Sequence, residues 1–158
     1  MGKIRVMRGQ ARAYQYDGAI QLIQDDHRFN HGFKIRRFVV SYEFPADSGA
    51  SSRDLIAALA THEDAFQVGP GVQVAWNWAD RRQVAWASTN HVGDSIVDQT
   101  FELIDPTHVV VRDLWFACSV LTSSGTNYFN YYIELEKIDL TDDQAVLAIV
   151  QEEAQDVN

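Results

Sequence analysis

Residues 127–140 read NYFNYYIELEKIDL, and this stretch decides the fold class. Apolar and polar side chains alternate along most of it. One side carries Phe129, Tyr131, Ile133 and Leu135, and the other carries Asn130, Tyr132, Glu134 and Glu136. Because successive side chains of a β-strand point to opposite faces, the alternation predicts a strand with one buried face.

Further strands are predicted on the N-terminal side of this stretch. Residues 33–44, FKIRRFVVSYEF, are rich in β-branched and aromatic residues and predict a long strand. Residues 72–79 and 83–89, separated by Asp80-Arg81-Arg82, predict a hairpin. Other strands are expected at 3–8, 96–104 and 108–121, whereas 18–28 reads as a short helix or a loop.

Two helices are expected. After the break at 45–50, Ser51 offers an N-cap to an amphipathic helix near 52–66. Thr141-Asp142-Asp143-Gln144 matches a capping box, which predicts a terminal helix from 142 to about 155. Its apolar stripe, Val146, Ile149 and Val150, packs on the same domain or reaches a neighbouring copy.

These elements predict a mainly β protein, an antiparallel β-sandwich of single jelly-roll-like type with one mid-chain helix and one C-terminal helix. The chain has 158 residues and is 46% apolar, which fits one compact domain. Within it we expect a basic N-terminal arm and loop at 1–32, the sandwich at 33–140 and the terminal helix at 141–158.

Charge is distributed unevenly along the chain. Residues 1–40 hold eight Lys or Arg and three Asp, whereas 41–158 hold five basic and nineteen acidic residues, for a net charge of -9. Lys3, Arg5, Arg8 and Arg12 are not interrupted by an acid. This pattern indicates an arm that meets phosphate or an acidic neighbouring subunit, and the simpler alternative is a solvated basic strand.

Three tryptophans lie in the predicted hairpin. The two-residue spacing of Trp76 and Trp78 places them on one strand face, and Trp86 lies on the partner strand. Such a cluster either stacks on sugar rings or bases, or fills the core or a subunit interface.

The sequence does not indicate an enzyme. His27 and His31 have a helical metal-ligand spacing, but no third ligand is marked near them, and the five His are spread widely. Nucleophile and phosphate-binding motifs are absent, and Cys118 lies among apolar neighbours. We therefore expect no catalytic residue, no metal and no cofactor, and without an apolar run of about 18 residues we expect no membrane partner.

The layout over residues 33–140 resembles the small single jelly-roll coat proteins of non-enveloped icosahedral viruses. The resemblance is carried by HVVVRDLWF at 108–116 and NYFNYYIELE at 127–136. It implies a structural protein of the virion that associates with itself into an icosahedral shell. It also implies that Lys3, Arg5, Arg8 and Arg12 form an arm facing nucleic acid, although this arm is short and the remaining chain is strongly acidic. The alternative is a soluble carbohydrate- or small-ligand-binding sandwich that uses Trp76, Trp78 and Trp86.

Overall fold

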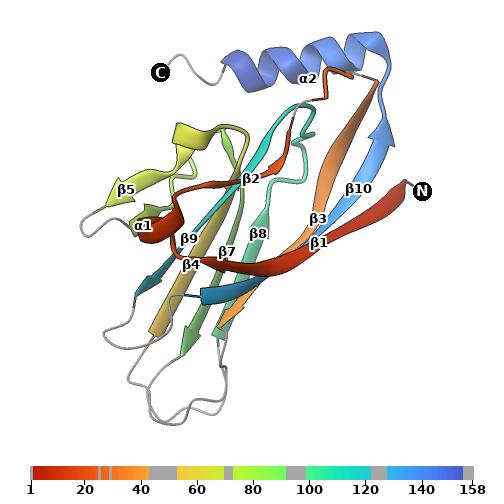
Figure 1. Ribbon diagram of the computed structural model, residues 1–158. Helices are drawn as coiled ribbons and strands as arrows, with labels where there is room; N and C mark the ends of the chain where they lie inside the picture. The colour runs from red at the N-terminus through yellow and green to blue at the C-terminus, as the bar shows by residue number, and fades with distance from the viewer. Residues whose placement is uncertain are drawn as a thin grey trace.

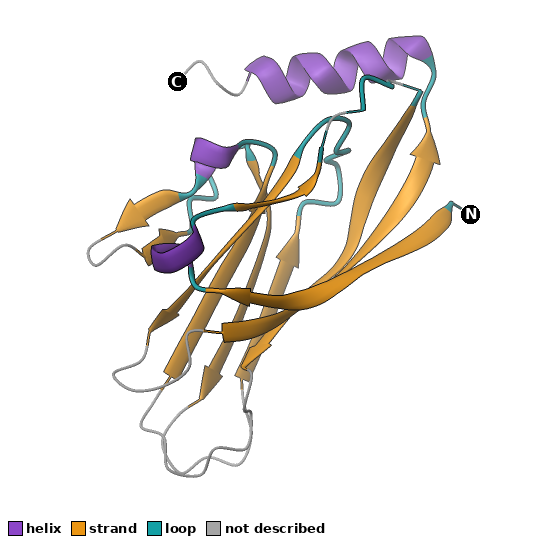
Figure 2. Cartoon of the chain, viewed as in Figure 1, coloured by secondary structure: helices purple, strands orange, loops and turns teal. Residues whose placement is uncertain are grey.

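The computed structural model describes residues 2–24, 26–28, 30–42, 53–69, 73–91, 99–121 and 128–154, which form two antiparallel β-sheets packed face to face (Figures 1 and 2). The elements, in chain order, are β1 (Lys3–Arg12), α1 (Tyr14–Asp17), β2 (Ile20–Ile23), β3 (His31–Tyr42), β4 (Arg53–Ala60), the 3-10 turn η1 (Glu63–Ala65), β5 (Gln67–Gly69), β6 (Gln73–Ala75), β7 (Gln83–His91), β8 (Gln99–Ile104), β9 (Leu114–Leu121), β10 (Tyr128–Asp139) and α2 (Asp142–Ala154).

The three-stranded sheet has the order β1-β10-β3, and the five-stranded sheet has the order β2-β9-β4-β7-β8. A small third sheet pairs β5 with β6. Neighbouring strands are antiparallel throughout, and the register between β10 and β3 shifts between Glu134 and Leu135. The mainly β class and the predicted long strands at 33–44 and 127–140 are therefore confirmed.

The core lies between the two sheets. Phe129, Ile133 and Leu135 of β10 are fully buried, as their alternation predicts, and they face Phe116 of β9. The rings of Phe116 and Phe129 lie 5.5 Å apart between centroids. The two sheets are also joined by a hydrogen bond, which the Tyr42 hydroxyl donates to the carbonyl of Thr89 at 2.7 Å. This bond connects β3 of one sheet to β7 of the other.

The predicted helix near 52–66 is wrong. Residues 53–60 form β4, the central strand of the five-stranded sheet, and the rest of the predicted helix, residues 61–66, contains the 3-10 turn η1. Leu55 and Leu59 of β4 enter the main core, while Ala58 and Ala60 enter a second cluster with Phe66, Val74 and Trp86 on the other side. A strand buried on both faces lacks the alternation that distinguishes a strand from a helix. Ser51 and the expected break at 45–50 lie outside the described residues.

Three other predictions differ from the structure, in the type of an element, the pairing of two strands and the start of a strand. Residues 20–23 form strand β2 in place of the expected short helix or loop. The predicted Trp hairpin is wrong, because β6 pairs with β5 whereas β7 pairs with β4 and β8. The strand expected over 108–121 begins at Leu114, and before it Val110 makes a single bridge to Phe33.

The N-terminal segment is part of the sandwich. Residues 3–12 form β1, which pairs with β10 along its whole length. Met7 packs against the core and Ala11 is buried in it. The basic segment is therefore an integral edge strand of the three-stranded sheet, longer than the strand expected at 3–8.

The terminal helix and its capping box are confirmed. The Thr141 amide donates to Gln144 Oε1 at 3.1 Å, and the Gln144 amide donates to Thr141 Oγ1 at 3.4 Å. The helix α2 lies across one end of the sandwich (Figure 1). Ala145 and Ala148 are buried and Ile149 is half-buried, whereas Val146 and Val150 of the predicted stripe are exposed.

Candidate functional site

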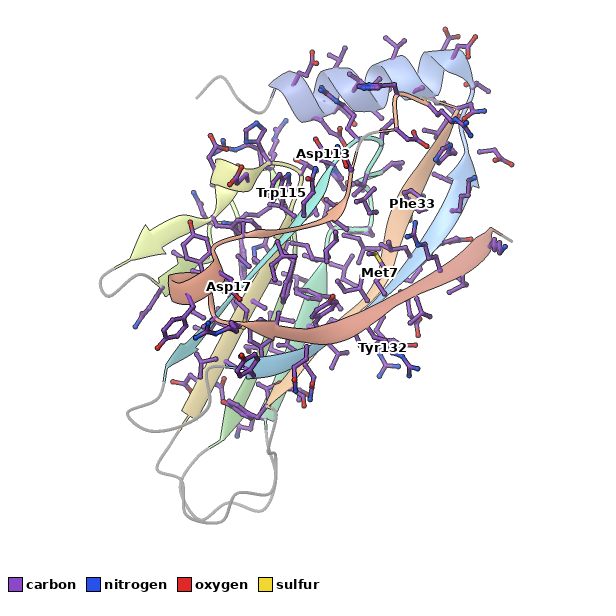
Figure 3. The ribbon with its side chains drawn as sticks, viewed as in Figure 1. Met7, Asp17, Phe33, Asp113, Trp115 and Tyr132 are labelled. Carbon is purple, nitrogen blue, oxygen red and sulfur yellow. The ribbon has the colours of Figure 1, made fainter. Side chains whose placement is uncertain are left out.

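The four predicted basic residues lie on two sides of β1. Met7 and Tyr132 mark the two sides of the three-stranded sheet (Figure 3). By register and strand alternation, Lys3 and Arg5 share the side of Met7, which packs against the core, and Arg8 and Arg12 share the outer side with Tyr132 of β10. This split follows from the two-residue period of a strand, because odd and even positions face opposite ways. The structure therefore does not gather the four cations into one patch.

Arg12 is held by two aromatic rings. Its guanidinium carbon lies 4.6 Å from the ring centroid of Tyr16 and 5.6 Å from that of Tyr128. Its Nε is buried and lacks a hydrogen-bond partner among the described residues. Arg12 thus packs within the fold, while Lys3, Arg5 and Arg8 remain exposed on β1.

Further cations come from β3 and were not singled out in the sequence. Arg36 forms an ion pair with Glu136, and its Nε donates to Glu136 Oε2 at 2.6 Å. The Arg36 hydrogen bond and a second one from the Gly2 amide hold the pKa of Glu136 below its ordinary value of 4.5. Arg37 lies over the ring of Tyr132, 5.8 Å from its centroid.

The Tyr132 hydroxyl donates to Glu134 Oε1 at 2.9 Å. This hydrogen bond, to a carboxylate that favours the neutral phenol, raises the pKa of Tyr132. The same sheet contains a hollow of about 470 Å³, lined by Arg8, Gly9, Val39, Val40, Ser41, Asn130, Tyr131 and Tyr132. The outer face of the three-stranded sheet is therefore a mixed surface of cations, tyrosines and short apolar side chains.

The three tryptophans have different environments. Trp86 is buried and donates from Nε1 to Gln83 Oε1 at 2.7 Å, and Trp76 is half-buried and donates to the carbonyl of Ala57 at 3.1 Å. Trp78 is 62% exposed, and its ring meets that of Trp86 at an interplanar angle of 62°. The cluster is consequently not a flat stacking platform of three rings.

The exposed part of this region is extended by β8. The ring of Trp76 lies 5.4 Å from that of Phe101, which is itself exposed, as is Leu103 two residues later. Phe101 and Leu103 share one strand face, and Leu103 is paired in register with Trp86. We call Trp78, Phe101 and Leu103 the aromatic patch.

The outward side of α2 forms another apolar surface. Val146, Leu147 and Val150 are 60, 59 and 52% exposed. On the inward side, Glu152 accepts a hydrogen bond from the Val111 amide at 3.0 Å. Glu153, one turn after Val150, pairs with Arg112 at 2.9 Å. The helix is thus fixed to the sandwich while three aliphatic side chains face outward.

His27 and His31, whose spacing in the sequence is that of metal ligands on a helix, lie in the segment before β3 and at its first residue. His31 begins β3 and lies 3.8 Å from Asp26, and the preceding His27 has a φ of 58°, so the two His are not on a helix. No group of three or more His, Cys, Asp or Glu side chains suited to a metal ion occurs among these residues. Cys118 is buried, and burial raises the pKa of its thiol well above 9.0.

A polar hollow of about 420 Å³ lies near the end of the sandwich covered by α2, and its charges are mostly paired. It is lined by Thr61, His62, Arg82, Arg112, Asp113, Glu152 and Glu153. Arg82 bonds to both Asp80 and Asp64, at 2.9 and 3.1 Å. These bonds join η1 to the segment before β7, and a separate ion pair joins Arg112 to Glu153 of α2.

Comparison with known proteins does not assign a family. The chain matches no protein-family model, and no curated protein resembles it significantly in sequence. In the part of the chain that the structure describes, no helix is both long enough and apolar enough to cross a membrane.

Proposed function

We propose that this protein is a structural subunit that associates with itself, of the single jelly-roll coat type, and that its copies build an icosahedral shell. The observation that carries the proposal is the order in which strands meet. The strands nearest the two ends of the chain pair with each other, β1 with β10 and β2 with β9. The inner strands β4 and β7 also pair with each other.

This order is typical of one long antiparallel ribbon that has rolled up. Rolling the ribbon brings β10 beside β3 and β9 beside β4, which are two of the three remaining contacts within the two large sheets. Two Greek keys of this kind make a jelly roll, an architecture used by viral coats, lectin domains and cupins. The strand β8 departs from the pattern, because it pairs with β7 and reaches β3 through a side chain, where Glu102 accepts the Phe38 amide at 2.7 Å.

The exposed apolar surfaces support assembly. They are the outward side of α2, the aromatic patch, and Ile4 with Val6 on β1, each 47% exposed. These three surfaces lie on different elements, and a closed shell requires each subunit to make more than one kind of contact. Within the proposal, Lys3, Arg5 and Arg8 are the cations of β1 available to an acidic neighbour or to nucleic acid.

The alternative function, a carbohydrate- or small-ligand-binding sandwich, is favoured by one observation. Trp78 is exposed next to Trp86, and a solvent-facing indole ring stacks well on a sugar. The buried Trp86 and half-buried Trp76 leave that ring without a coplanar neighbour from the predicted cluster. Self-association is therefore the better supported function.

The decisive experiment is a mass measurement of the purified protein by light scattering, with negative-stain imaging, at low and at high salt. We expect closed particles far heavier than the 17.9 kDa chain, loosened by salt where charge pairing contributes. A monomer at every concentration and salt would overturn the proposal. Glycan binding by that monomer, lost in a Trp78→Ala variant, would establish the alternative.

A further inference from the structure

The helix α2 has two apolar faces, and the fold uses one of them. Its inward face is occupied, since Ala145 and Ala148 are buried and Glu152 bonds to the Val111 amide. Val146, Leu147 and Val150 occupy the opposite side, at spacings of one, three and four that keep them together on a helix. A surface helix normally turns polar side chains to solvent, so this outward face has the character of a contact surface.

The charge around this outward face is negative. The helix contains Asp142, Asp143, Glu152 and Glu153 and no Lys or Arg. Asp142 and Asp143 are exposed in its first turn, one turn before Val146. A surface that covers Val146, Leu147 and Val150 should therefore be apolar at its centre and positively charged at its border.

The outer side of β1 has this composition. Ile4 and Val6 are nearly half exposed there, and Arg8 follows on the same side. On this side β1 carries Arg8 and the packed Arg12 and no acid, and β3 of the same sheet adds Lys34, Arg36 and Arg37. The strand β10 places Glu136 beside Ile4 and Glu134 beside Val6. Glu136 is only 8% exposed and bonded to Arg36, and Glu134 accepts a hydrogen bond from the Tyr132 hydroxyl.

Two other pairings within the molecule fit less well. Two α2 helices packed against each other would bring the acids of both copies together with no cation from either helix. The aromatic patch is apolar, and β8 contributes no Lys or Arg beside it. Charge thus selects β1 as the surface for α2.

We propose that the outward face of α2 in one copy docks on the outer side of β1 in a second copy, with Val146, Leu147 and Val150 covering Ile4 and Val6. The contact rests on the proposed function and names one interface of the assembly. The two halves of the contact are different surfaces of one chain, so a bound pair still presents one free half of each kind. Association of this head-to-tail type continues until a ring closes, and a closed shell requires further contacts beside it.

Two multiple variants test the contact. The helix variant carries Val146→Lys and Val150→Lys, two exposed sites where Lys is the better helix former. The strand variant carries Ile4→Thr, Val6→Thr and Arg8→Glu, which keeps β-branched residues on β1 and reverses one charge. A control, Thr100→Lys, adds a positive charge at an exposed site of β8, outside both proposed surfaces. Circular dichroism and thermal unfolding verify that each variant is folded, and Arg8→Glu alone replaces the strand variant if the latter unfolds.

The readout is mass by sedimentation velocity, for each variant alone and for an equimolar mixture. We expect each variant to associate at least about tenfold more weakly than the wild type and to stop at a small species. In the mixture, the intact helix of one variant binds the intact strand of the other, so the mass should double and then stop. Thr100→Lys should assemble like the wild type.

The outcomes separate this contact from the proposed function. If the wild type assembles and both variants reach the wild-type mass, the contact is overturned while self-assembly stands. If the mixture stays at the mass of the single variants, the two surfaces do not bind each other and the contact is again overturned. If the wild type is a monomer throughout, the proposed function fails, and the contact fails with it.

Discussion

Glu136 illustrates what strand alternation predicts for a residue and what it leaves out. The pattern of residues 127–140 places Glu136 on the polar side of the strand, and the structure agrees. Its burial was not predictable, because it depends on Arg36, which the register shift between Glu134 and Leu135 leaves without a direct partner on β10. A side-chain pair formed across such an irregularity of the sheet can be predicted only when the strand register is known.

The lowered pKa of Glu136 makes stability depend on pH in a defined direction. A carboxyl whose pKa is lower in the folded protein stabilises the fold above its ordinary pKa of 4.5, and this contribution is lost as pH falls through the folded value. We expect a Glu136→Gln variant to be less stable than the wild type at pH 7 and to lose less stability on acidification. Urea unfolding at pH 7 and at about pH 3 measures the difference. Glu63→Gln, at an exposed site of η1, is the control, and identical pH profiles for Glu136→Gln and wild type would contradict the assignment.

Among the elements, β4 and α2 show opposite results for the same kind of reasoning. Both contain aliphatic residues at helical spacing, and the pattern predicts a helix for each. The prediction holds for α2, where a capping box marks the start and one face is exposed to solvent. It fails for β4, because neighbouring strands on both sides and packing on both faces outweigh the high helix propensity of its alanines.

Partners of strands were less predictable than the strands themselves. The Trp hairpin was expected because its two segments are adjacent in sequence, yet β6 joins β5 and β7 joins β4. Of the candidate site, the sequence identified Trp78 and the exposed cations of β1. It did not identify Phe101 and Leu103, whose alternation on β8 is the signal, because their exposure depends on β8 lying at a sheet edge.

The capping box of α2 gives a prediction at the scale of the element. Thr141→Ala removes the hydroxyl that accepts the Gln144 amide, and loss of such a cap costs about 1 kcal/mol. We expect a lower midpoint of thermal unfolding and faster amide exchange in the first turn of α2. The control is Gln151→Ala on the same helix, where an exposed side chain is shortened without loss of a cap. Unchanged exchange in the first turn would show that the hydroxyl does not stabilise the helix start.

At the scale of the whole molecule, β1 decides whether the N-terminal segment is an arm or part of the fold. Its ten residues pair with β10, and Met7 and Ala11 contribute to the core. We expect deletion of residues 2–12 to abolish cooperative unfolding, since it exposes apolar core and leaves β10 unpaired on one side. Near-ultraviolet circular dichroism and thermal denaturation measure the loss.

A charge variant is the control for this deletion. Lys3→Gln, Arg5→Gln and Arg8→Gln together remove the exposed cations of β1 and retain its pairing with β10. This variant should fold like the wild type and differ from it in association. If the deletion also folded like the wild type, β1 would be dispensable and would act as an arm.

The contact between Glu102 and Phe38 bears on how the two sheets move relative to each other. At this border, β3 and β8 lie next to each other, and the Glu102 carboxylate accepts a hydrogen bond from the Phe38 amide across it. A side-chain joint has more rotational freedom than a backbone ladder, because its carboxylate turns about two or three single bonds. A small shift between the two sheets at this border would strain this contact and not a backbone ladder, because β3 and β8 are not paired with each other. Identical copies that must occupy non-equivalent positions on a curved surface would gain their small differences in shape at this joint.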